Sequence, residues 1–210
     1  MREIATYGIS YLDELAGSGG WYWAAADGPC DLSAAYEMHM GGIDLPASMI
    51  FVHHPDGKVI SPFEAAHGQQ FGAPVFCDGR ICVLRADFGA GIMEILAHDP
   101  AVSKTHVLAA LPLELAGSCV DLRLSTYPLT LTVRHGECCT RMLWPERRDI
   151  CTRSGEELLL RDGERLYFSY RPSSRARRGT VVRSAMTGEV IERKDGQVML
   201  MPDGQKWILG

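Results

Sequence analysis

The sequence of 210 residues predicts an all-β fold. The first observation is the dipeptide Asp-Gly, which stands between short apolar runs at positions 56–57, 78–79, 162–163, 195–196 and 203–204. Asp and Gly both tolerate the positive φ angles of a type I′ turn, so this dipeptide is a strong hairpin signal. The second observation is that helix signals are confined to the first 45 residues. Residues 48–210 are therefore expected to form short strands joined by tight turns.

The strands themselves show two kinds of pattern. Between positions 129 and 134, apolar residues alternate with Thr and Arg, as in a strand with one buried face. Residues 81–84 and 166–170 are instead apolar or aromatic on both faces. Such strands are covered on both sides. Because helices are scarce, the covering layers are expected to be other sheets.

Two segments near the N-terminus carry helix signals. Residues 10–17 begin with a capping-box-like pattern and end in glycine. Residues 31–40 begin with Asp31, a good N-cap, and are followed by Gly41. We predict a short helix in each place.

The Asp-Gly turns recur at regular intervals. Asp78 and Asp162 are 84 residues apart, and Asp162 and Asp203 are 41 apart, which indicates a unit of about 42 residues. Residues 121–125 fit as a degenerate copy between the first two. Residues 21–23 fit as an earlier copy, displaced by an insertion that contains the helix at 31–41. Five reference strands result.

A repeat of about 40–50 residues with four strands is typical of a β-propeller blade. We therefore predict that residues 1–210 form one domain, a small β-propeller of five blades of about 42 residues. Residues 2–10 are expected to supply a strand that completes the last blade and closes the ring. The alternative is a β-sandwich or a β-barrel.

The amino-acid sequence at the repeated turns resembles that of known proteins. Residues 54–59 and 201–207 are similar to the Pro-Asp-Gly hairpins of β-propeller repeats, such as those of sensor-kinase, lyase-type and TolB-like propellers. The resemblance covers only the turns and their flanks. It implies the fold and identifies no functional residue or functional family.

Composition limits the class of protein. The apolar fraction of 46% and the charged fraction of 22% are those of a globular protein. The sequence has neither an apolar run of about 20 residues nor a signal-peptide pattern, which predicts a cytoplasmic protein without a membrane span. The seven cysteines include no CxxC pair and are expected to be reduced. The net charge of −5 does not favour nucleic-acid binding, and the basic run at 171–178 is interpreted as a solvated loop.

Standard catalytic and phosphate-binding motifs are absent from the sequence. His53 and His54 are neighbours in a strand and should point to opposite faces, so no metal site is predicted, and no cofactor. Alignment of the repeats gathers charged residues at the far ends of the reference strands, and these are our candidate ligand-binding residues: Asp27, Arg85, Asp87, Arg123 and Arg171. Charges of both signs on a concave surface suit a small polar, sugar-like or anionic ligand. The alternative is that they form strand-end salt bridges.

Three functional hypotheses follow. The favoured one is a non-enzymatic binding or interaction module, with a small polar ligand or a protein as its partner. The second is a hydrolase or lyase that uses Asp27 and Asp87 as an acid–base pair. The third is a structural protein that associates with itself. No catalytic residue is assigned.

Overall fold

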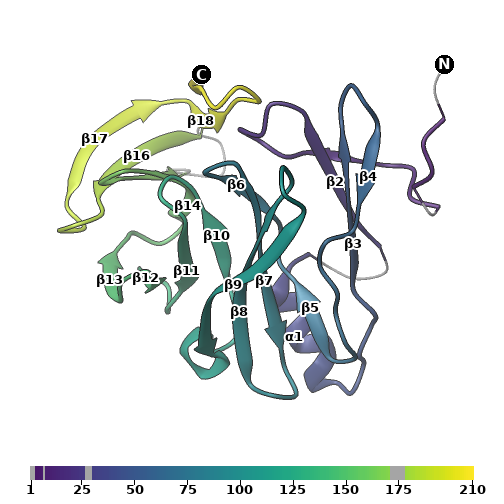
Figure 1. Cartoon of the computed structure of the whole chain (residues 1–210). Coiled ribbons are helices and arrows are strands. Elements are labelled where there is room, and N and C mark those ends of the chain that lie inside the picture. Colours follow the sequence, from purple (N-terminus) through teal and green to yellow (C-terminus); the bar gives the residue numbers. More distant parts are fainter. Residues whose placement is uncertain (1–2, 7, 27–29, 171–177) are drawn as a thin grey trace.

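The computed structural model describes residues 3–6, 8–26, 30–170 and 178–210. Antiparallel sheets follow one another along the chain and are arranged around a common centre (Figure 1). The first sheet contains β1 (Asp13–Glu14), β2 (Trp21–Ala26), β3 (Ser48–His53) and β4 (Lys58–Ile60). In the second, β5 (Gln69–Phe71) and β6 (Val75–Cys77) share one edge of β7 (Arg80–Asp87), followed by β8 (Ile92–Asp99) and β9 (Lys104–Pro112).

The remaining sheets continue the same order. The third contains β10 (Arg123–Ser125), β11 (Thr130–Arg134), β12 (Cys139–Trp144) and β13 (Arg148–Cys151). The fourth contains β14 (Glu157–Asp162), β15 (Arg165–Tyr170), β16 (Gly179–Ser184) and β17 (Val190–Asp195). The fifth has only β18 (Gln197–Leu200) and β19 (Lys206–Leu209). The all-β propeller prediction is confirmed, with four complete blades.

The prediction of five blades is wrong, because the fifth position of the ring holds a two-stranded hairpin. Among the described residues near the N-terminus, 3–6 and 8–12 form no strand that could complete it. Ile9 and Leu12 instead pack on the outer face of the first blade, against Ala24, Ile50 and Val52. The ring is closed between the hairpin and the first blade by the Gly19 N–H, which donates to the Pro202 carbonyl at 3.2 Å. The N-terminal segment therefore covers a blade rather than extending one.

In the third blade, the predicted reference strand differs by one strand from the true equivalent. In the other blades the reference strand is the second from the centre, as β7 and β15 are. Residues 121–125 contribute β10, the innermost strand, whereas the equivalent second strand is β11. The long β8–β9 hairpin makes the second unit longer and leaves the third shorter. The spacing of about 42 residues is therefore an average over unequal blades.

The Asp-Gly turns are not all alike. Asp78 and Gly79 both have positive φ, 51° and 76°, and join β6 to β7 as the predicted type I′ turn. Asp162 instead pairs with Arg165, so that the two-residue loop begins at Gly163. Residues 195–196 join β17 to β18, which belong to different sheets, and the hairpin predicted there is wrong.

One of the two predicted helices is present. Helix α1 (Leu32–Met40) is capped by Asp31, whose carboxylate accepts a hydrogen bond from the Ser33 N–H at 2.9 Å, and Gly41 follows its last turn. The helix predicted at residues 10–17 is wrong. Residues Asp13 and Glu14 pair with β2 as strand β1, because tertiary pairing overrides a weak local helix signal. A single 3₁₀ turn, η1 (Leu113–Ala116), follows β9.

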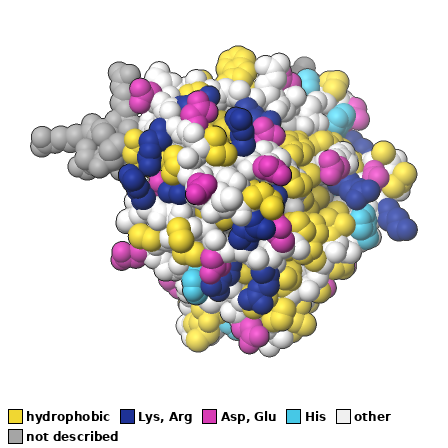
Figure 2. Space-filling view, turned by 90° about the vertical axis from the view of Figure 1, so that its left-hand side faces the viewer, with side chains coloured by type: hydrophobic (Ala, Val, Ile, Leu, Met, Phe, Trp, Pro, Cys, Tyr) yellow, Lys and Arg dark blue, Asp and Glu magenta, His cyan; other side chains and the backbone are white. Residues whose placement is uncertain are grey.

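The hydrophobic core lies between adjacent blades. Phe51, Phe63 and Val83 belong to the cluster between the first and second blades, and Phe168 and Met142 to that between the third and fourth. This confirms that strands apolar on both faces are covered by other sheets. The outer surface is mixed: Figure 2 shows apolar side chains interspersed with charges of both signs on the side where β13 and β17 lie. No helix in the described part of the chain has the length and apolar character to cross a membrane.

Candidate functional site at the centre of the ring

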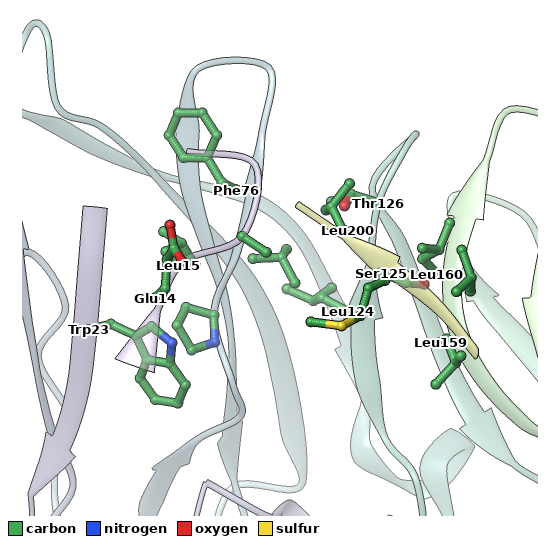
Figure 3. Close-up of a pocket in the computed structure, with 15 residues that line it drawn as sticks. Glu14, Leu15, Trp23, Phe76, Leu124, Ser125, Thr126, Leu159, Leu160 and Leu200 are labelled. Atoms are coloured by element: carbon green, nitrogen blue, oxygen red, sulfur yellow. The ribbon is translucent and has the colours of Figure 1, made fainter. Parts of the chain in front are cut away.

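The innermost strands of all five sheets meet around a cavity of about 310 Å³ (Figure 3). Strands β1, β6, β10, β14 and β18 each supply side chains to its wall, and β2 adds an indole. The lining residues are Glu14, Leu15, Ala16, Trp23, Pro74, Val75, Phe76, Leu124, Ser125, Thr126, Leu159, Leu160, Val198, Met199 and Leu200. This is the central channel of the propeller, which is the usual place for a propeller ligand.

The wall of the central cavity is mainly apolar. Figure 3 shows Glu14 and Trp23 on one side, with Leu124, Ser125 and Leu160 across from them. Glu14 is exposed and gives the cavity a carboxylate on that side. An apolar wall with a few polar groups is typical of a ligand pocket, because burial supplies affinity and the polar groups fix orientation.

Ser125 is the most unusual polar group in the wall. The residue is only 4% exposed, and its Oγ has no hydrogen-bond partner among the described residues. A buried hydroxyl without a partner costs about 1–3 kcal/mol.

The apolar surface continues outward from the cavity along the hairpin. Met199 in the cavity wall lies directly opposite Trp207, and Leu209 is two residues further along β19, so the three side chains share one face. All three are about half exposed, at 47%, 51% and 51%. In the described part of the chain no strand pairs with the outer edge of β19. We call this cavity and the adjoining face of Met199, Trp207 and Leu209 the central groove.

A second cavity, of about 490 Å³, lies beside α1. Tyr36, His39 and Phe88 line it, and the rings of Tyr36 and His39 both pack near that of Phe88. The His39 Nδ1 lies 2.7 Å from the Asp44 carboxylate. These contacts anchor the helix to the second blade, and this cavity does not receive side chains from the inner strands of the ring.

The structure places Arg85 and Asp87 on β7, outside the central cavity. Arg85 forms a salt bridge with Glu94 and donates to the Glu64 carbonyl at 3.0 Å. The Asp87 carboxylate accepts hydrogen bonds from Gln69 Nε2 at 2.8 Å and from the Ala90 N–H at 2.7 Å. These hydrogen bonds, above all the one from Gln69, hold the pKa of Asp87 below its ordinary value.

Arg123 lies on β10, where its guanidinium is 2.8 Å from Glu157 and 3.3 Å from Asp121. Arg134 joins the same group, with its Nε 2.7 Å from Asp121. Arg85 and Arg123 thus form salt bridges, as the alternative interpretation expected, whereas the Asp87 carboxylate is held by hydrogen bonds. Asp27 and Arg171 lie outside the described residues. A ligand-binding role for the five stays a prediction.

Sequence reasoning missed the residues of the central groove. Neither Trp23 nor Trp207 is among the candidate residues, and Glu14 lies within the segment 10–17 that was predicted to be helical. Residues 206–209 did carry a signal for a binding surface, because a strand with Trp, Ile and Leu on both faces needs a covering layer. Ser125 carries no local signal, since its burial depends on contacts distant in sequence.

Comparisons with known proteins support the fold and no more. No protein-family model matches the chain, and no curated protein matches it. A structure described as an analysis of two prolyl endopeptidases aligns with a TM-score of 0.52 and 14% identity, over 93% of this chain and 30% of that one.

Two other solved structures align less well. Dipeptidyl peptidase 4 from Porphyromonas gingivalis gives a TM-score of 0.44 at 10% identity, over 76% of this chain and 25% of that one. A mitotic checkpoint complex gives 0.45 at 11% identity, over 92% of this chain and 58% of that one. The chain thus spans between a quarter and three fifths of the structures it resembles. It is a β-propeller of four complete blades with a two-stranded hairpin in the remaining position of the ring.

Proposed function

We propose that the protein is a non-enzymatic binding module, and that its central groove holds an extended, mainly apolar segment of a protein partner. The observation that carries the proposal is the continuity between the central cavity and the exposed face of Met199, Trp207 and Leu209. Contiguous exposed apolar surface beside a cavity marks a binding site.

The backbone supports an extended partner. Among the described residues no strand pairs with the outer edge of β19, so an added strand would bond to its N–H and C=O groups while alternate side chains extend the face of Met199, Trp207 and Leu209. Each of the four complete blades has two further strands beyond the position that β19 holds in the hairpin, so an added strand would continue the blade pattern. Glu14 in the cavity wall of the central groove favours a segment that carries a basic residue.

The test uses a synthetic peptide of eight residues in which Val alternates with Thr, with one Lys at its N-terminus. We expect saturable binding by isothermal titration calorimetry, with a negative heat-capacity change because apolar surface is buried. Met199→Asp and Trp207→Asp should weaken binding at least tenfold. Ile191→Asp, at an exposed apolar position of β17 outside the groove, is the matched control and should leave it unchanged.

Two outcomes would overturn the proposal. Equal binding by the Met199→Asp variant and the control would place the contact elsewhere. A protein that dimerises in light scattering, and becomes monomeric in the Trp207→Asp variant, would show that a second copy covers the groove instead.

A further inference from the structure

We infer that Cys139 and Cys151 form a redox modification site, a dithiol that closes to a disulfide across β12 and β13 when it meets a low-molecular-weight disulfide such as glutathione disulfide. The two cysteines lie directly opposite each other in the antiparallel ladder. Both are free thiols, with Cys151 exposed and Cys139 half-buried. This site is independent of the central groove.

The backbone hydrogen bonds define the kind of pair. The Thr152 N–H donates to the Cys138 carbonyl at 2.9 Å, which is the bond that flanks a non-hydrogen-bonded pair at Cys139 and Cys151. In such pairs the Cα atoms are about 4.5 Å apart and the side chains lie close together. A disulfide accepts Cα separations of about 4.4–6.8 Å, so the strands do not have to move.

An ion pair fixes this register. Arg141 and Asp149 are the next directly opposed residues on the same face. The Arg141 guanidinium donates to the Asp149 carboxylate from two of its nitrogens, Nε at 2.6 Å and Nη2 at 2.8 Å. A one-residue slip of β13 would break this pair as well as separate the two sulfurs, so the dithiol is held in place before oxidation.

The other cysteines provide a contrast within the same chain. Cys77 lies opposite Arg80 and Cys82 lies opposite Val75, so these two cysteines are diagonal neighbours. Diagonal Cα atoms are about 7–8 Å apart, beyond the reach of a disulfide. Burial raises the pKa of Cys77 to about 11 and that of Cys82 to about 12, which keeps both as unreactive thiols.

The exchange proceeds in two balanced steps. The exposed Cys151 thiolate attacks one sulfur of glutathione disulfide, which forms a mixed disulfide and releases one glutathione thiolate. The Cys139 thiolate then attacks the Cys151 sulfur, forms the protein disulfide and releases the second glutathione. Two protein thiols are oxidised, glutathione disulfide is reduced, and the two thiol protons pass to the two glutathiones. Burial, and then Asp149, raise the pKa of Cys139, so the second step should accelerate as pH rises.

The experiment equilibrates the full chain in glutathione buffers of graded oxidation, then unfolds it in the presence of an alkylating reagent that blocks every free thiol, and maps disulfides by peptide mass spectrometry. We expect one bridge, Cys139–Cys151, with the other five thiols alkylated. The Cys139→Ser variant should stop at the mixed disulfide on Cys151, and Cys151→Ser should lose the bridge. Cys138→Ser, at the neighbouring position opposite Thr152, is the matched control and should retain it.

Circular dichroism of each variant checks that it is folded. Three results would overturn the inference: a bridge that uses Cys138 in place of Cys139, a wild-type protein that accumulates only the mixed disulfide, or a bridge that forms only in urea. Each would mean that the native register does not bring the two sulfurs together.

Discussion

The buried ion pair of the fourth blade gives the sharpest stability prediction. The Arg183 guanidinium lies 2.9 Å from the Glu156 carboxylate and also donates to the Gly188 carbonyl at 2.9 Å. The Glu156 carboxylate further accepts the Arg153 N–H at 3.1 Å. The two side chains are 8% and 1% exposed, so water cannot replace either partner. Glu156→Ala would leave the Arg183 charge buried without its carboxylate.

The expected cost follows from the geometry. Removing one partner of a buried pair destabilises a protein by about 3–5 kcal/mol, and opposite charges 4 Å apart interact by about 4 kcal/mol at an effective dielectric constant near 20. For a chain of this size each kcal/mol lowers the melting temperature by about 2–4 °C. Glu156→Ala should therefore melt about 6–20 °C lower than the wild type. The double variant Glu156→Leu with Arg183→Met should remain within about 2 kcal/mol of it, because no unpaired charge is left.

Urea unfolding followed by circular dichroism measures the free energies, and scanning calorimetry measures the melting temperatures. Glu192→Ala is the control in the same blade, since the pair of Glu192 with Lys194 is exposed and its loss should cost less than about 1 kcal/mol. The reasoning is refuted if Glu156→Ala costs no more than this control, or if the double variant is as unstable as the single one.

Three further predictions test other parts of the fold. Gly79→Ala should lower the free energy of unfolding by about 1 kcal/mol, because alanine is strained at the φ of 76° although its Cβ has open space; a neutral result in urea unfolding would contradict the type I′ turn. Phe168→Ala, at a fully buried position between blades, should cost about 3–5 kcal/mol in the same assay. Burial lowers the pKa of His98 below the ordinary 6.5, so the folded state binds its proton more weakly than the unfolded state. The stability gained from the neutral His98 is complete above pH 6.5 and is lost as the pH falls below it. The urea concentration at the unfolding midpoint should therefore decrease when the pH is lowered from about 7.5 to about 5.5. His98→Gln should make this decrease smaller.

Local features of the fold were predictable from sequence where one short segment determines them. Asp31 and Gly41 mark the ends of α1, and Asp78 with Gly79 sets a type I′ turn. These depend on backbone angles and capping, which neighbouring residues decide.

The blade count was not predictable in the same way, because it depends on partners distant in the chain. Residues 121–125 read as a reference strand, yet their pairing with β11 alone makes them the innermost strand of the third blade. The candidate site was missed for the same reason. Ser125 and Trp23 reach one cavity only after five strands, each from a different sheet, have converged.

The two-stranded hairpin also determines how the ring opens. It is joined to the fourth blade by Thr180, whose hydroxyl donates to the Gly196 carbonyl and accepts the Val198 N–H, and by Lys206, whose Nζ lies 2.8 Å from Asp162. Each of the other sheets buries far more of its own side chains. Local opening free energies follow such differences, so the hairpin should be the first cooperative unit to detach, while the four blades stay folded. Amide hydrogen exchange would then report two populations, with β18 and β19 exchanging through a sub-global opening that uncovers the centre of the ring.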